Sequence, residues 1–261
     1  MLEFGVMAER KEEPVPGNVA GRRVALALGL PLAMAIVTSL VVANITAATN
    51  LSSQARTAVI MSSIAIVSWL LGLRWYGLQG LGLRGGRPLY AGIGFASLAW
   101  VVFLAIRIFT VSISELGTGD STRSYIYLLL FEAFATQIWT YGLLFRTVAD
   151  WRGPLAAAVS SGLIFGLVAI LLFQESFTGT QFSIITFFAW GVLYGIIRLR
   201  TGSILGTVLV QSLQSFSAWI ALPPYPRPDP AQLQNLYLFT THAYLIINRR
   251  LWPKEEDDYR V

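Results

Sequence analysis

The sequence has no cysteine and only one histidine among its 261 residues. Without thiols there can be no disulfide bonds or thiolate metal sites, and one imidazole excludes a metal site that needs several histidines. Charge is also scarce, because 13% of the residues are charged where soluble domains carry roughly a quarter. We therefore do not expect a large soluble domain.

Apolar residues take the place of the missing charge: they make up 55% of the chain and occur in long runs. A helix that spans a bilayer needs about 20 mostly apolar residues. Eight segments meet or approach this requirement, so we predict an all-α, polytopic membrane bundle. The predicted helices are Val24–Ile45, Ala58–Leu73, Tyr90–Ile113, Ser124–Phe145, Leu155–Phe173, Phe182–Ile197, Ile204–Ala221 and Leu233–Ile247.

The predicted organisation has three parts. Residues 1–23 form a cytoplasmic N-terminal tail, residues 24–251 the transmembrane domain, and residues 252–261 a charged cytoplasmic tail. The first apolar run is too long for the apolar region of a signal peptide, so we expect it to stay as a helix.

The basic residues support this count of helices. With the N-terminus inside, 15 of the 19 Lys and Arg residues fall in inside segments, and the outside segments hold only Arg56, Arg123 and Arg227. The positive-inside rule then places both termini in the cytoplasm. The net charge of +5 follows from this topology, and we expect no nucleic-acid partner. The expected location is the bacterial inner (cytoplasmic) membrane, and the expected partners are membrane lipids and other integral membrane subunits.

Small residues recur at helical spacing in two predicted helices, at Gly162 and Gly166 and again at Gly191 and Gly195. Such pairs let two helix backbones approach closely. We interpret them as sites of tight helix packing.

Two charged residues, Arg107 and Glu132, lie inside the third and fourth predicted helices. Charge within a bilayer is costly, so such residues usually pair. We predict an intramembrane ion pair between them. It could fix the helix register, or it could contact a substrate.

His242, the only histidine, lies inside the eighth predicted helix. A neutral imidazole that is hydrogen-bonded to a neighbouring helix is one interpretation. The other is an axial ligand to haem or bacteriochlorophyll, since a tetrapyrrole supplies the remaining ligands itself. No other cofactor or metal site is predicted, although bound lipids are expected.

Several short, motif-like segments lie in the fourth to seventh predicted helices and the turns between them. The fourth carries Thr136-Gln137, then Tyr141 and Phe145-Arg146. The fifth carries Phe165-Gly166-Leu167-Val168-Ala169. A Thr201-Gly202-Ser203 turn and the segment Gln211-Ser212-Leu213-Gln214-Ser215 follow.

The order and spacing of these features resemble the CPBP family of CAAX-protease and bacteriocin-processing intramembrane peptidases. The resemblance covers roughly Phe131 to Ser215, within a protease-like core over about residues 124–221. It implies an eight-helix fold with Glu-Glu, Arg, His and His-x-x-x-Asn at the active site. This sequence departs from the family pattern at each of those positions, which are Thr136, Gln137, Tyr141, Ala169, Gln211 and Ser215.

These departures remove the chemistry that the family uses. Peptide hydrolysis needs a base or a metal to activate water, and neither glutamine nor alanine supplies one. Glu132 lies one helical turn before Thr136 but has no neighbouring histidine in sequence. We therefore predict a protein that is not an enzyme, with a cavity between the fourth, fifth and seventh helices that could hold a helix, a lipid or a pigment.

The leading hypothesis is a binding, accessory or assembly subunit of a larger membrane complex. One alternative is a pigment-binding subunit of a photosynthetic or respiratory complex that uses His242. Another is a divergent intramembrane peptidase that remains active. A transporter is not favoured, because no inverted repeat is evident.

Overall fold

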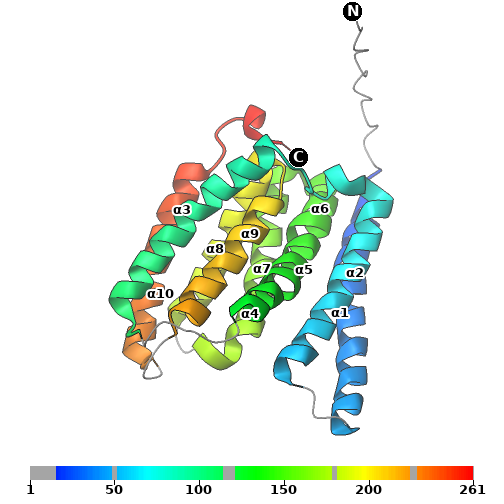
Figure 1. The fold of residues 1–261 in the computed structure, drawn as a ribbon. Coiled ribbons are helices and arrows are strands. Elements are labelled where there is room, and N and C mark those ends of the chain that lie inside the picture. The colour runs from blue at the N-terminus through cyan, green and yellow to red at the C-terminus, as the bar shows by residue number, and fades with distance from the viewer. Residues whose placement is uncertain (1–15, 49–51, 114–120, 178–180, 224–227, 261) are drawn as a thin grey trace, which may run out of the picture.

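The computed structural model describes residues 16–48, 52–113, 121–177, 181–223 and 228–260, and within these ranges the chain is an all-α bundle (Figure 1). The elements are α1 (Gly17–Ala48), α2 (Ser53–Gly80), α3 (Arg87–Thr110), α4 (Ser121–Tyr127), η1 (Leu128–Phe134), α5 (Ala135–Gln137), η2 (Ile138–Leu144), α6 (Phe145–Arg152), α7 (Pro154–Phe177), α8 (Gln181–Thr201), α9 (Leu205–Ser215), η3 (Phe216–Ala221), α10 (Pro230–Leu251) and η4 (Glu256–Asp258).

These elements form eight long helical rods, which confirms the predicted helices within the described parts of the chain. The fourth rod is the continuous helix from α4 to α6, and the seventh consists of α9 and η3. Six of the described helices are long and apolar enough to cross a membrane; the seventh rod and α10 are not among them. The chain is thus an integral membrane protein by the composition of its helices, and eight crossings remain a prediction. Residues 49–51, 114–120 and 224–227, which lie between predicted helices, are outside the described residues.

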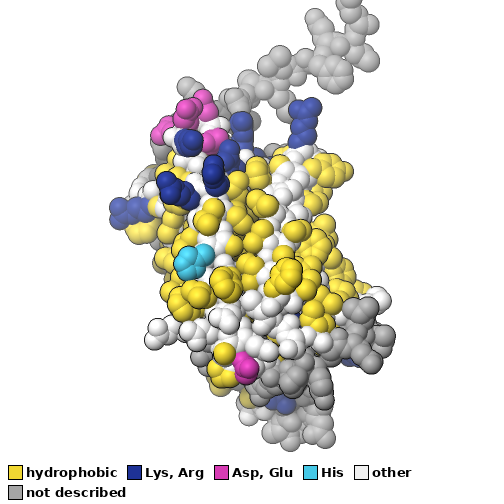
Figure 2. Space-filling view, turned by 90° about the vertical axis from the view of Figure 1, so that its left-hand side faces the viewer, with side chains coloured by type: hydrophobic (Ala, Val, Ile, Leu, Met, Phe, Trp, Pro, Cys, Tyr) yellow, Lys and Arg dark blue, Asp and Glu magenta, His cyan; other side chains and the backbone are white. Residues whose placement is uncertain are grey.

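Successive rods alternate in direction, so the first described residues and the C-terminal tail lie at the same end of the bundle (Figure 1). Most described Lys and Arg side chains belong to this end, and Figure 2 shows them gathered there on the face that carries α3 and α10. We call it the basic end. Arg56 and Arg123, near the starts of α2 and α4, belong to the opposite end.

Helices α7 and α8 are in backbone contact at the predicted glycines. A Cβ added at Gly191 would collide with the carbonyl oxygen of Gly162, and one at Gly195 with that of Ala158. Hydrogen at these positions therefore lets the two backbones touch.

Helix α2 is kinked near its C-terminal end. Gly77 has a φ of 65°, a non-helical, left-handed conformation that favours glycine, and the helix resumes for a short stretch to Gly80. The loop that follows bonds to the start of the seventh rod, because Gly82 accepts the Ile204 N–H at 2.9 Å and Arg84 accepts Ser203 Oγ at 2.8 Å through their backbone carbonyls.

Helix α3 directly precedes the fourth rod in sequence but does not pack beside it. It packs against α8, α9 and α10, and α9 in turn packs against η1. The seventh rod therefore separates the third from the fourth (Figure 1).

Candidate functional site

The fourth rod carries the first motif-like segment, and its backbone departs from a regular α-helix there. Two π-helical segments, η1 and η2, flank the short α5, which contains Thr136 and Gln137. A π-helix bonds each N–H to the fifth residue before it, and such turns occur often at functional sites. No feature of residue spacing predicts these segments from the sequence.

Thr136 and Gln137 face the seventh rod and join its side chains in what we call the amide–hydroxyl cluster, namely Thr136, Gln137, Thr207 and Gln211. Gln137 Nε2 donates to Gln211 Oε1 at 2.8 Å. Thr207 Oγ1 donates to Gln137 Oε1 at 3.0 Å, and Gln211 Nε2 donates to Thr136 Oγ1 at 3.4 Å. All four side chains are buried, so the cluster closes on itself.

Thr207 was not singled out in the sequence. It lies four residues before Gln211, so both side chains project from one face of α9. That spacing is the signal that could have identified it.

Glu132 lies one turn before Thr136 and is also buried. Its carboxylate accepts a hydrogen bond from Ser215 Oγ at 2.7 Å, and its backbone carbonyl accepts one from Thr136 Oγ1 at 2.6 Å. The structure therefore brings Glu132 and Ser215 next to the amide–hydroxyl cluster, between the same two rods.

The predicted ion pair between Arg107 and Glu132 is wrong. The Arg107 guanidinium donates to the carbonyl oxygens of Val111 at 3.1 Å and Leu222 at 2.9 Å. Arg107 lies in the last turn of α3, and the seventh rod stands between α3 and the fourth rod. Helices that are consecutive in sequence were assumed to be neighbours, and here they are not.

Tyr141, which stands where the CPBP pattern has an arginine, is a packing residue. Its hydroxyl donates to the carbonyl of Gly191 at 2.5 Å, where α7 and α8 are closest. Its ring packs against Phe165 and Tyr194, at centroid distances of 5.6 Å and 6.3 Å. Ala169, one turn after Phe165, is buried in the same apolar core.

The expected cavity between the fourth, fifth and seventh rods is closed at the motif positions. Gln137 and Tyr141 have 0% exposure, and Gln211 has 2%. Amides and rings fill the space, because each amide finds a partner and each ring finds another ring.

Gln214 makes a separate contact. It lies three residues after Gln211, but its Nε2 donates to Tyr244 Oη on α10 at 3.1 Å. Gln137, Gln211 and Gln214 therefore all bond between helices, and α9 is bonded to the fourth rod through Gln211 and to α10 through Gln214.

Arg198 is a buried residue that sequence reasoning counted only as a topology signal. It is 1% exposed, and it donates from Nε to the carbonyl of Tyr141 at 3.1 Å and from Nη2 to that of Gly80 at 2.9 Å. Its guanidinium carbon lies 5.3 Å from the centroid of the Phe145 ring. Arg198 thus ties α8 to the second π-helical segment and to the end of α2.

His242 lies on the exposed outer face of α10, away from the cluster. Its Nδ1 is 2.8 Å from the carbonyl oxygen of Leu238 in the same helix, so the predicted bond to a neighbouring helix is wrong. A carbonyl only accepts, so this hydrogen bond requires the proton on Nδ1.

The chemistry available between the fourth and seventh rods follows from these side chains. The buried polar groups are amides and hydroxyls plus one carboxylate, Glu132. Within the described ranges, no three His, Cys, Asp or Glu side chains come close enough to hold a metal ion. The arrangement can hold helices together and offers one carboxylate without an imidazole partner.

Comparison with known families supports the resemblance over this region. Residues 119–217 match the family model of the type II CAAX prenyl endopeptidase Rce1-like proteins. The match covers the fourth to seventh rods and leaves α1 to α3 and α10 outside it. No curated protein matches the sequence.

Proposed function

We propose that this Rce1-like membrane protein has lost peptidase chemistry and works by binding, as an accessory or assembly subunit of a larger membrane complex. The observation that carries the proposal is the amide–hydroxyl cluster. The motif positions Thr136, Gln137 and Gln211 still meet between the fourth and seventh rods, but they bond to one another. A water-activating site would need a free base or a metal in that place.

The burial of the cluster also bears on how the protein would bind. Gln137 has no exposed surface, so a substrate or ligand would have to displace packed side chains to reach it. Binding therefore falls to the outer surfaces of the bundle. Helix α1 is the least covered of the six apolar helices, since 11% of its membrane-spanning window is buried.

A cleavage assay tests the loss of chemistry. The purified chain, reconstituted in vesicles, is incubated with a fluorogenic prenylated CAAX peptide, beside the variant Glu132→Gln and empty vesicles. We expect all three to give the same background rate. Cleavage by the wild type that Glu132→Gln abolishes would overturn the proposal and make Glu132 the base of an active peptidase.

A native purification tests the binding role. Membranes are solubilised in mild detergent, and the mass of the tagged chain is measured on a native gel and by light scattering. We expect a stable assembly heavier than the chain alone, with other membrane subunits in fixed ratio. A monomer in every mild detergent tested would contradict an accessory role.

A pigment-bearing subunit is the second candidate, and the geometry of His242 favours it. Ligating histidines usually donate their other ring N–H to a carbonyl or carboxylate, as Nδ1 does here toward Leu238. Nε2 would then be the ligand of the tetrapyrrole metal.

The test is an absorption spectrum of the native protein. The variant is His242→Ala, and the matched control is Leu245→Ala, which lies on the same exposed face. A Soret or Q band that only His242→Ala removes would support this candidate. A wild-type spectrum without tetrapyrrole absorption would eliminate it.

A further inference from the structure

We infer that a pocket at the basic end of α10 binds the headgroup of an anionic phospholipid. The pocket has a volume of about 620 Å³ and is lined by Ile246, Arg249, Arg250 and Lys254. Volumes of roughly 300–1,000 Å³ are typical of small-molecule sites. The inference does not depend on whether the chain is an enzyme.

The charges of the pocket are uncompensated within it. Among the described residues that line it, Arg249, Arg250 and Lys254 are cationic and none is acidic. Asp258 in the C-terminal tail pairs with Arg200 at 3.2 Å. A phosphodiester would supply the missing negative charge, and guanidinium groups bind phosphate oxygens well.

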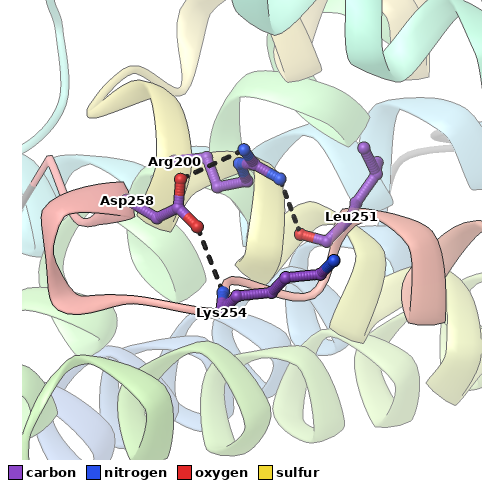
Figure 3. Close-up of polar contacts among 4 residues, drawn as sticks. All are labelled: Arg200, Leu251, Lys254 and Asp258. Carbon is purple, nitrogen blue, oxygen red and sulfur yellow. Dashed lines mark hydrogen bonds and ion pairs between the residues drawn. The ribbon is translucent and has the colours of Figure 1, made fainter.

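One lining residue, Lys254, belongs to the C-terminal tail, whose polar contacts with Arg200 are drawn in Figure 3. Arg200 Nη1 donates to the Leu251 carbonyl at 3.2 Å, and Nη2 donates to Asp258 Oδ1 at 3.2 Å. Asp258 Oδ2 accepts the backbone N–H of Lys254 at 3.1 Å. These bonds hold the turn after α10, so Lys254 is kept beside the two arginines.

The surface below the pocket suits an acyl chain. Phe239, Leu245 and Ile246 are exposed apolar residues on the outer side of α10, and Figure 2 shows apolar side chains on this face below the basic groups. Phe239 lies ten residues before Arg249, which is about 15 Å along a helix. That equals half the thickness of a hydrocarbon core of roughly 30 Å. A lipid could therefore place its phosphate in the pocket and one chain along α10.

The position of the pocket within the bundle agrees with a lipid. Basic pockets at the polar ends of membrane helices bind anionic headgroups, and each Lys or Arg adds attraction. The pocket also opens at the end of a helix whose outer face is apolar, where a soluble anion would gain nothing from the surface below.

The experiment measures lipid binding to the purified, delipidated full chain by native mass spectrometry. Dioleoyl phosphatidylglycerol and dioleoyl phosphatidylcholine are titrated in parallel, and inorganic phosphate and glycerol phosphate serve as soluble anions. The pocket variant is Arg249→Gln with Arg250→Gln. The matched control is Arg22→Gln with Arg74→Gln, two exposed arginines of the same end that do not line the pocket.

We expect phosphatidylglycerol to bind the wild type at least about tenfold more tightly than phosphatidylcholine. The pocket variant should lose roughly thirtyfold, about fivefold for each arginine, and the control should change less than about twofold. The charge-conserving variant Arg249→Lys with Arg250→Lys should keep most of the affinity. A lipid-free melting temperature shows whether each variant is folded.

Three results would overturn the inference. Equal affinity for the two lipids would show that the pocket does not distinguish anionic from neutral headgroups. An equal loss in the control would show diffuse attraction to the whole basic end. Competition by glycerol phosphate or inorganic phosphate at the concentration of the lipid would make this a site for soluble anions.

Discussion

The inner and outer rods of this bundle differ in what surrounds their side chains. In the fourth rod and in α8, 72% of the membrane-spanning window is buried, against 11% in α1 and 22% in α2 and α3. The motif positions lie on the fourth rod, α7 and α9, within the region that matches the Rce1-like model, and their side chains are buried. Under the proposed binding role, a partner would therefore contact the outer surfaces.

The largest expected effect lies at the backbone contact between α7 and the inner rod α8. The substitution Gly191→Ala places a Cβ against the Gly162 carbonyl, and backbone cannot move aside as a side chain can. We expect a loss of at least about 3 kcal/mol in the free energy of unfolding, or failure to fold. Thermal unfolding in detergent measures it.

The matched control for this contact is Gly94→Ala, where an added Cβ would meet nothing within 4 Å. Alanine is the better helix former, so this variant should be neutral or gain up to about 1 kcal/mol. Equal effects of the two substitutions would contradict the tight contact of α7 and α8.

The amide–hydroxyl cluster gives the next largest effect, and a double-mutant cycle separates its parts. Gln137→Leu leaves the Gln211 and Thr207 groups buried without their partner, at a cost of about 1–3 kcal/mol. Adding Gln211→Leu removes the second amide, and replacing both partners of a bond by apolar groups can be nearly neutral. We expect the double variant to be more stable than Gln137→Leu alone, by chemical unfolding. Additive losses would mean that the two amides are not coupled.

Much of the fold follows from the sequence, for reasons visible in individual elements. Apolar runs of sufficient length located every rod, and the glycine pairs located the α7–α8 contact. Boundaries were less accurate: α2 extends from Ser53 to Gly80, beyond the predicted Ala58–Leu73. Helices continue through polar flanks at the membrane surface, where hydropathy falls but hydrogen bonding does not.

The candidate site was predicted only in part, because the order of the helices in the sequence does not show which helices pack side by side. The order and spacing of the motif positions predicted that Thr136, Gln137 and Gln211 lie together, and they do so in the structure. Arg107 was assigned to Glu132 because α3 and the fourth rod are consecutive, yet α9 intervenes. The π-helical segments depend on backbone bonding that residue type does not determine.

A smaller effect is expected at the tail that closes the basic end. Asp258→Asn weakens the partly exposed contact with Arg200 and the support of the Lys254 turn. Exposed ion pairs contribute little, so stability should fall by about 0.5 kcal/mol. Phosphatidylglycerol binding should nevertheless weaken several-fold, because Lys254 loses its fixed position. The control is Asp257→Asn, which changes an exposed residue. Equal lipid binding by both variants would show that the tail does not support the pocket.

The smallest effect on stability is expected on the outer face itself, at His242. Its ring is exposed and bonds only within α10, to Leu238, among the contacts described. His242→Ala should therefore change the free energy of unfolding by less than about 0.5 kcal/mol, as surface substitutions usually do. A destabilisation of several kcal/mol, measured by thermal unfolding of the native complex, would show that a partner or a pigment covers this face. The comparison of inner and outer rods would then hold only for the isolated chain, because α10 would be an inner helix of the assembly.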